Sequence, residues 1–282
     1  MIIKTEGIVL RSRPFSKTSR VLTWLTPDYG RVTTVIKGAC RPKSFFLGQT
    51  DLGYRCELLF YRKEHNGVHI AREVYPLDVR EGLRGNWRAS VAADYACWFA
   101  AQVTEPMLAT PDIYALLDEN LALLAGLTDG RALEQAVAQY EFRLLDLLGV
   151  APNFDFCRDC TFAPDKRKSC RFMLPAGHLG CIHALGIHRE SESSVALTPS
   201  LVEALAAAQT AARRGNAPFL PDNPRLSIGI RRFLGLFICH HLDIPMHQRS
   251  TAYAWLDWDR YEKEFEEPIL RDTESTAHME KE

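Results

Sequence analysis

Four cysteines lie close together in the middle of the chain, and their spacing is typical of a metal site. They are Cys157, Cys160, Cys170 and Cys181. The Cys-x-x-Cys pair formed by the first two places two thiolates on one tight turn, where both can bind the same tetrahedral metal ion. Because the N-terminus does not read as a signal peptide, we expect a reducing compartment, which favours metal binding over disulfides. The sequence therefore predicts a small structural zinc element.

The sequence allows more than one residue as the fourth ligand of this zinc site. A second Cys-x-x-Cys pair would need cysteine at positions 181 and 184, but position 184 is Ala184. Cys170 offers the softer ligand after a modest rearrangement of the loop, whereas His183 lies nearer but gives a cramped Cys-x-His. A weak or lost metal site and a disulfide are the alternatives. If zinc binds, we expect it to fold an element too small to have a core of its own.

A catalytic metal is a poorer interpretation of the same region. His188 and Glu190 imitate the His-x-Glu of zinc deaminases, but there the His-x-Glu precedes the Cys-x-x-Cys, and here Phe156 stands where proline is expected. The chain also has no His-Glu-x-x-His, no Gly-x-Ser-x-Gly, no Walker A motif and no Gly-x-Gly-x-x-Gly. We therefore predict a protein that is not an enzyme. The scattered Cys40, Cys56, Cys97 and Cys239 are predicted to be buried small apolar residues.

Charge is distributed unevenly along the chain. The 282 residues have a net charge of −1, but residues 1–50 hold nine lysines and arginines and two acidic residues. Residues 257–282 hold ten acidic and four basic residues. A basic head indicates a polyanionic partner, and an acidic tail is usually solvated. No run of 18 apolar residues is present, so we expect no membrane span.

Residues 1–80 carry the pattern of a small β domain. Short runs rich in β-branched residues recur between turn signals, at residues 7–10, 20–25, 31–36, 54–61 and 68–74. Five short strands fit a small closed barrel, and the five-stranded oligonucleotide-binding (OB) barrel is the leading candidate. The number of strands alone does not separate it from other small barrels.

A basic loop follows the third predicted strand. Residues 37–46 combine Lys37, Arg41 and Lys43 with glycine, proline and the adjacent aromatics Phe45 and Phe46. Cations neutralise phosphates and exposed aromatics can stack on bases, so the loop can bind nucleic acid. Alternatively, it is a solvated loop whose phenylalanines plug the end of the barrel. We predict phosphate contacts from its three cations, supported by further basic residues, namely Arg11, Arg13, Lys17, Arg20 and Arg31.

The remainder of the chain is helical outside the cysteine region. Apolar residues at three- and four-residue spacing predict helices at residues 87–104, 111–126, 131–148, 199–214 and 225–241. The fold class is therefore multidomain α+β, with a barrel followed by an all-helical domain that contains a zinc-finger-like insertion. The predicted boundaries are 1–80 for the barrel, 81–152 and 191–250 for the helical domain, 153–190 for the insertion, and 251–282 for an acidic, disordered tail.

Several short stretches, in this order, resemble a known family, the bacterial recombination mediator RecO. They are residues 7–13, 25–31, 37–39, 41–44, 142–149, 151–152, the Cys157-x-x-Cys160 pair and 249–250. The resemblance implies an OB-fold barrel, a helical domain and, in many members, a zinc finger. The chain departs from the zinc-bearing pattern at Ala184.

The resemblance also implies a function. RecO-like proteins are not enzymes; they bind single- and double-stranded DNA and anneal complementary strands. They dock on the C-terminal tail of single-stranded-DNA-binding protein (SSB) and act with RecR to load RecA, in the cytoplasm at the nucleoid. The alternative from another functional class is a protein-interaction scaffold without direct DNA binding.

Overall fold

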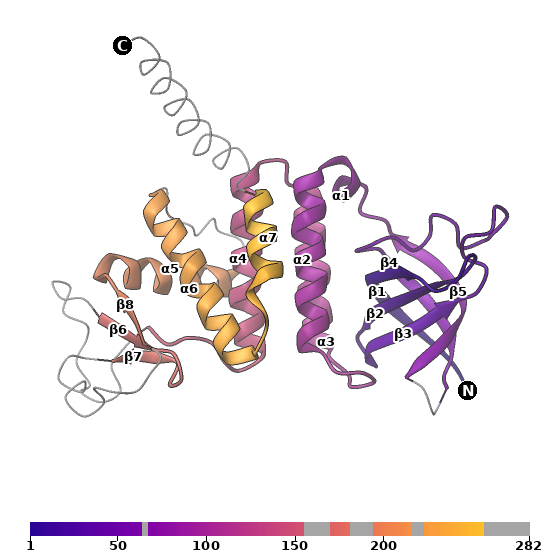
Figure 1. Cartoon of the computed structure of the whole chain (residues 1–282), viewed down its shortest axis with the longest axis horizontal. Helices are drawn as coiled ribbons and strands as arrows, with labels where there is room; N and C mark the ends of the chain where they lie inside the picture. Colours follow the sequence, from indigo (N-terminus) through magenta and orange to yellow (C-terminus); the bar gives the residue numbers. More distant parts are fainter. Residues whose placement is uncertain (64–66, 155–169, 181–193, 216–220, 222, 257–282) are drawn as a thin grey trace, which may run out of the picture.

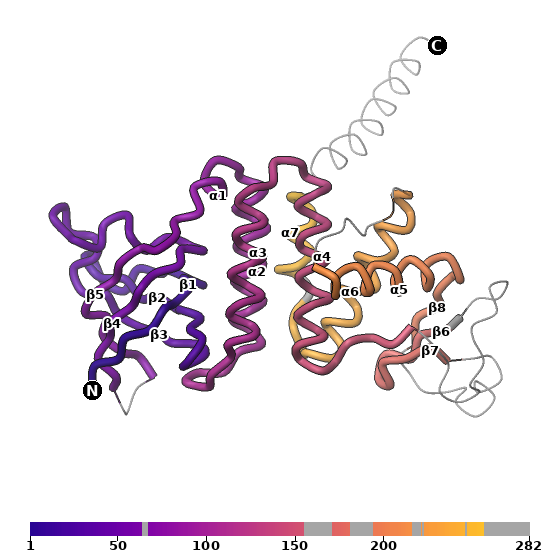
Figure 2. The backbone as a smooth tube through the Cα atoms, turned by 180° about the vertical axis from the view of Figure 1, so that it is seen from behind, coloured from indigo at the N-terminus to yellow at the C-terminus, as the bar shows by residue number. Residues whose placement is uncertain are grey.

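The computed structural model describes residues 1–63, 67–154, 170–180, 194–215, 221 and 223–256. Its parts lie in a row (Figure 1): a five-stranded sheet at one end, helices in the middle and a three-stranded sheet at the other end. Figure 2 shows the same row from behind, with α2 and α3 between the barrel and the helices α4 to α7. Within these residues no helix is long and apolar enough to cross a membrane.

The N-terminal sheet has the five strands that the sequence predicts. They are β1 (Ile2–Pro14), β2 (Arg20–Thr26), β3 (Gly30–Ile36), β4 (Arg55–Tyr61) and β5 (Val68–Asp78). The strand order is β1-β2-β3-β5-β4, and β4 pairs again with β1, so the sheet closes on itself. The pairing of β3 with β5 is parallel, and the other four pairings are antiparallel.

Side chains alternate between the inside and the outside of the barrel along each strand, and the apolar ones fill the inside. Leu22 and Trp24 of β2 point inward with Phe60 of β4, and all three are fully buried. The Trp24 indole nitrogen donates a hydrogen bond to the Thr34 hydroxyl at 2.9 Å, so its one polar atom is satisfied inside an apolar core. Burial of such side chains is the main term that stabilises a domain of this size.

Seven helices are described in the rest of the chain. They are α1 (Glu81–Gly85), α2 (Trp87–Val103), α3 (Pro111–Gly126), α4 (Gly130–Leu147), α5 (Pro199–Arg214), α6 (Pro224–Leu242) and α7 (Met246–Leu256). Five of these coincide with the predicted helices, while α1 and α7 were not predicted. Both are short, so neither presents enough apolar periodicity to stand out from its surroundings.

Local capping signals begin and end several of these helices. Asn86, Asp129 and Thr198 each accept a hydrogen bond from a backbone N–H in the first turn of the helix that follows. Gly215 ends α5 in the left-handed conformation, which glycine adopts without steric cost. Thr110 precedes α3, but its side chain makes no capping hydrogen bond.

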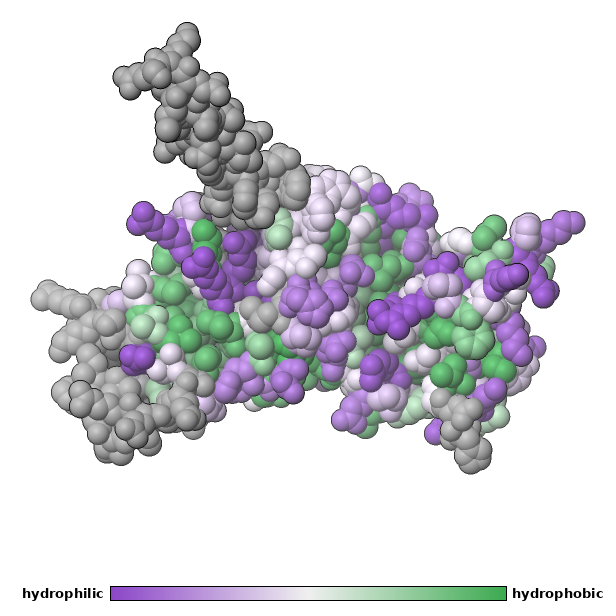
Figure 3. All heavy atoms as spheres, in the orientation of Figure 1, coloured by the Kyte–Doolittle hydropathy of each residue, from purple (hydrophilic) through white to green (hydrophobic). Residues whose placement is uncertain are grey.

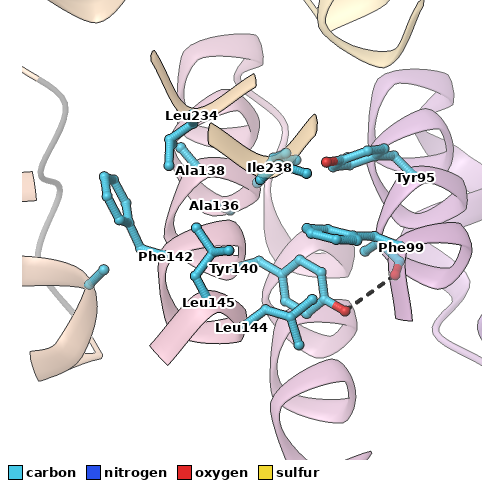
Figure 4. Packing of buried hydrophobic residues seen from close by; sticks show 14 of the residues in the cluster. Tyr95, Phe99, Ala136, Ala138, Tyr140, Phe142, Leu144, Leu145, Leu234 and Ile238 are labelled. Carbon is cyan, nitrogen blue, oxygen red and sulfur yellow. Dashed lines mark hydrogen bonds between the residues drawn. The ribbon is translucent and has the colours of Figure 1, made fainter. Parts of the chain in front are cut away.

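The centre of the helical part is an aromatic and aliphatic core. Figure 4 shows Tyr95 and Phe99 of α2 facing Tyr140 and Leu144 of α4, with Leu234 and Ile238 of α6 above. Phe99 and Tyr140 pack edge to face with their ring centroids 6.3 Å apart. The Tyr140 hydroxyl donates a hydrogen bond to the Ala96 carbonyl at 3.3 Å. The apolar residues whose spacing predicts these helices therefore form the core of the helical part.

A small antiparallel sheet contains part of the cysteine region and the residues that follow it. Its strands are β6 (Cys170–Met173), β7 (His178–Gly180) and β8 (Ser194–Leu197), with β6 in the centre. Phe172 of β6 is fully buried. Its ring centroid lies 5.6, 4.9 and 5.9 Å from those of Phe154, Phe233 and Phe237, respectively. Because β8 pairs with β6, the sheet extends past the predicted boundary at residue 190.

The predicted start of a disordered tail at residue 251 is wrong for its first six residues, since α7 continues to Leu256. Arg249 of α7 explains why. Its guanidinium forms two hydrogen bonds, at 2.7 and 2.8 Å, with the carboxylate of Glu141 in α4, and both side chains are buried. The hydroxyls of Tyr95 and Tyr253 donate to the same carboxylate at 2.6 and 3.2 Å. This network holds α7 in the core. Residues 257–282 lie outside the described residues.

The barrel and the helices are joined by backbone contacts. The Arg31 N–H donates to the Glu105 carbonyl and the Thr110 N–H donates to the Pro27 carbonyl, each at 3.1 Å. The β2–β3 turn is thus hydrogen-bonded to the loop between α2 and α3. On a second side of the junction, the buried Arg80 guanidinium donates to the Gly53 carbonyl and to Asp118 of α3.

Gly30 allows the close approach at this junction. Its φ is +54°, and a Cβ there would lie 1.9 Å from the Leu108 carbonyl oxygen. We expect Gly30→Ala to lower the free energy of unfolding by more than about 2 kcal/mol, because the left-handed conformation alone costs roughly 1–2 kcal/mol. Gly48→Ala is the control, since Gly48 has a φ of +74° but no atom within 4 Å. Chemical denaturation measures both variants; an equal loss would show that the contact contributes nothing.

Candidate nucleic-acid interface

Two loops meet at one end of the barrel, on the side away from the helices (Figure 1). The strand register puts Pro14 opposite Arg20 and Arg20 opposite Ile36, so β1 ends, β2 begins and β3 ends at the same place. The loop of residues 15–19 and the loop that starts at Lys37 therefore begin side by side. The Cys40 N–H donates to the Thr18 carbonyl at 3.0 Å and ties the two loops together.

This end of the barrel gathers most of the cations predicted to bind DNA. Six of them are exposed: Arg11 and Arg13 in the second half of β1, Lys17 in the loop of residues 15–19, and Lys37, Arg41 and Lys43 in the basic loop. Figure 3 shows hydrophilic residues at this outer end of the barrel. Within the described ranges none of the six takes part in an ion pair. Arg20 is partly buried at the rim, where its Nε donates to the Ser12 hydroxyl at 2.8 Å. The end thus presents concentrated positive charge that no acidic side chain neutralises in this part of the chain.

Arg31 lies elsewhere. It pairs with Leu25, five residues along β2 from Arg20, which corresponds to about 17 Å at the usual rise of a strand. Its backbone contacts the loop between α2 and α3, accepting from the Met107 N–H at 3.3 Å. The structure does not bring Arg31 to the end where the six exposed cations gather.

The two neighbouring phenylalanines of the basic loop have opposite surroundings. Phe46 packs against the apolar interior of the barrel, so the predicted plug exists for this residue. Phe45 is 90% exposed. Sequence reasoning missed a third aromatic, Phe15, which is 65% exposed in the loop between β1 and β2. The signal for it was an aromatic between a proline and a Ser-Lys pair, in a segment too polar to be core.

The exposed cations at this end of the barrel can bind a polyanion. Lysine and arginine side chains on exposed loops release counterions when they meet phosphates, and that release drives binding regardless of base sequence. Closely spaced cations also attract a charged ligand over a distance of about 10 Å at moderate salt. Electrostatic attraction at this end of the barrel is therefore the chemistry that the site supports.

The predicted metal ligands fall mostly outside the described residues. Cys157, Cys160, Cys181 and His183 do so, as do His188 and Glu190; only the backbone of Cys170 is described, paired with Leu197 in the small sheet. In the part of the chain that the structure does describe, no group of three or more histidine, cysteine or acidic side chains could hold a metal.

The other four cysteines differ in their burial. Cys56 and Cys97 are fully buried, as predicted, and burial raises the pKa of each thiol to about 12. These thiols stay protonated and serve as small apolar side chains. The prediction is wrong for Cys40, which is exposed because it belongs to the basic loop and not to a strand. Cys239 in α6 is intermediate.

Comparison with known proteins identifies the family. The model described as "Recombination protein O N terminal" matches residues 1–79, and "Recombination protein O C terminal" matches residues 84–250. A protein of Alkaliphilus metalliredigens named "DNA repair protein RecO" is 28% identical over 244 residues, covering 86% of this chain and 95% of that protein. One of the same name from Myxococcus xanthus is 28% identical over 243 residues, covering 84% and 91%. This chain therefore belongs to the RecO family of DNA repair proteins.

Proposed function

We propose that this protein is a recombination mediator without enzymatic activity, which binds single- and double-stranded DNA at the basic end of an OB-type barrel. The observation that carries the proposal is the set of six exposed cations on two hydrogen-bonded loops and the adjoining second half of β1. OB-type barrels bind oligonucleotides on strands 2 and 3 and on adjacent loops, among them the loop between strands 1 and 2. Here the loop between β1 and β2 carries Lys17 and is hydrogen-bonded to the basic loop that follows β3.

Strand annealing follows from the same charge. Two single strands repel each other through their phosphates, and a cationic surface that contacts both lowers this repulsion. Base pairing then supplies the specificity, so the protein needs no base-specific contacts. We propose that the protein anneals complementary strands in this way.

Membership in the RecO family supports the proposed partners. These are RecR, the C-terminal tail of SSB and, indirectly, RecA, which the protein would help to load on SSB-coated single strands. The barrel end is the proposed DNA contact, which leaves the helical part for proteins. A scaffold that binds only proteins is the competing function.

Fluorescence anisotropy of the full chain with labelled single and double strands, at two salt concentrations, tests DNA binding directly. We expect binding to both forms and a steep loss of affinity as salt rises, by a factor set by the number of phosphate contacts. A scaffold without DNA contacts would bind neither oligonucleotide at low salt, and that result would overturn the proposal.

We also propose one structural zinc ion, held by Cys157, Cys160, Cys181 and either Cys170 or His183. Three thiolates with a fourth sulfur or imidazole ligand suit tetrahedral zinc. Cys170 begins β6, and β6 is anchored through the buried Phe172, so one candidate ligand starts from a fixed backbone. The ion would fold the cysteine region without taking part in DNA binding.

We expect metal analysis to find about one zinc per chain, lost in Cys160→Ser and retained in the control Cys239→Ser. Cys170→Ser and His183→Gln, compared side by side, identify the fourth ligand. Because Phe172 packs in the helical core, chelation should leave the main thermal unfolding transition in place. Stoichiometric zinc in Cys160→Ser, or no zinc in the wild type, would contradict the assignment.

A further inference from the structure

Two aromatic rings stand in solvent at the basic end of the barrel. Phe45 is 90% exposed and Phe15 is 65% exposed, whereas Trp24, Phe60 and the other large side chains of the barrel interior are buried. A phenylalanine left in water forgoes the free energy that its burial would contribute. Two such rings on the same end of one barrel indicate a surface that something covers.

The backbone around both rings is well tied down. The Phe15 N–H donates to the Ser19 carbonyl at 2.9 Å, which closes the loop into a tight turn. Next to Phe45, Phe46 is anchored in the barrel interior, and the Ser44 N–H donates to the Arg41 carbonyl at 2.9 Å. Because one phenylalanine faces inward, its neighbour is held outward, so the exposure of Phe45 is built into the loop.

Cations flank each ring along the chain. Phe15 lies between Arg13 and Lys17, and Phe45 follows Lys43 by two residues. A purely apolar partner would have to desolvate these exposed charges without pairing them, which is costly. A nucleic acid strand instead offers a phosphate for each cation and a base for each ring.

We propose that Phe15 and Phe45 stack on unpaired bases and thereby give this surface a preference for single-stranded over double-stranded DNA. The inference rests on the proposed DNA binding at the same end. In a duplex both faces of each base are already covered by neighbouring base pairs, so the rings gain no contact there. The cations, by contrast, meet phosphates in both forms of DNA. A base stacked on either ring must leave it to pair, so annealing itself removes these contacts and favours release of the duplex.

The test compares Phe15→Ala, Phe45→Ala and the double variant with the wild-type full chain on a labelled oligo-dT strand and on a duplex of equal length. Each substitution should lower single-strand affinity by about 5- to 150-fold, the usual effect of losing one stacked base. Duplex affinity and the salt dependence of both should stay unchanged, because no phosphate contact is lost. Both residues are exposed, so the variants should fold as the wild type does.

Matched controls separate stacking from other causes. Leu47→Ala removes an apolar side chain that is 62% exposed in the same loop, and should leave affinity unchanged. Phe45→Trp should retain affinity, and its fluorescence should be quenched by single strands. An abasic strand, which keeps the phosphates, should bind the wild type and the double variant equally.

Each of the following results would overturn the inference. They are an equal loss on single strand and duplex, no loss on the single strand, and a smaller salt dependence in the phenylalanine variants. If the wild type itself binds no DNA, the proposed function fails instead, so the two failures are distinguishable. Capture of a protein through Phe45 with no effect on DNA would also reject the inference.

Discussion

Replacing Lys37, Arg41 and Lys43 together with glutamine is expected to weaken binding to every DNA sequence and to flatten its salt dependence. All three side chains are exposed on the loop after β3. Each phosphate contact that is lost should reduce the slope of log affinity against log salt by roughly 0.9 on duplex and 0.7 on single strands. With three contacts removed, the slope should fall by about 2 to 3, and affinity at low salt by more than tenfold.

A charge-matched variant provides the control for this result. Arg214, Arg225 and Arg232 are exposed on α5 and α6, far along the chain from the barrel. Their combined replacement by glutamine changes the net charge equally. If affinity depends on the loop, the control keeps the wild-type slope; if both triple variants lose the same slope, only net charge matters and the barrel end is not the binding site.

Arg249→Met is expected to have the largest effect on stability, lowering the free energy of unfolding by about 3 to 5 kcal/mol. The Arg249 and Glu141 side chains are 6% and 0% exposed, so removing the cation leaves an unpaired carboxylate in the core. Although burial opposes it, the Glu141 carboxylate raises the pKa of the Arg249 guanidinium above its ordinary value. Arg249 therefore stays charged throughout the accessible pH range.

The Arg213–Asp146 pair is a matched control with similar geometry in a different environment. Its two hydrogen bonds measure 2.7 and 2.9 Å, but the side chains are 53% and 24% exposed. Arg213→Met should cost at most about 1 kcal/mol, as exposed pairs usually do. Urea denaturation measures both variants. Replacing Glu141 and Arg249 together with methionine should cost less than the sum of the single losses, because neither charge is then stranded.

The strands and long helices could be predicted because their signals are local. Apolar residues at every second position mark the β-strands, and apolar residues at three- and four-residue spacing mark the helices. Both patterns follow from backbone geometry alone. The turn at Pro27 to Gly30 is likewise a local signal, because proline and glycine favour the dihedral angles that a turn needs. Closure of the barrel, in contrast, depends on the parallel pairing of β3 with β5, whose partners are more than 30 residues apart. No local pattern reports such a pairing.

The candidate site was only partly predictable for the same reason. Counting charges identifies a basic segment, but the register decides which cations meet, and it separates Arg31 from the others. Phe45 and Phe46 are identical and adjacent, yet one is exposed and the other packs in the barrel. Phe15 was missed because a single aromatic in a polar turn carries no periodicity.

The amino-acid sequence determined the elements, the basic character of residues 1–50, the cysteine pair and the likeness to RecO, because each is a property of short stretches and their order. The tertiary structure alone decided which cations share one surface and which aromatic rings remain in solvent. It also decided the role of Arg249, since the sequence shows an arginine near the end and the fold brings it to Glu141, 108 residues earlier. Side-chain environments arise from contacts between distant segments, and those contacts exist only after the chain has folded.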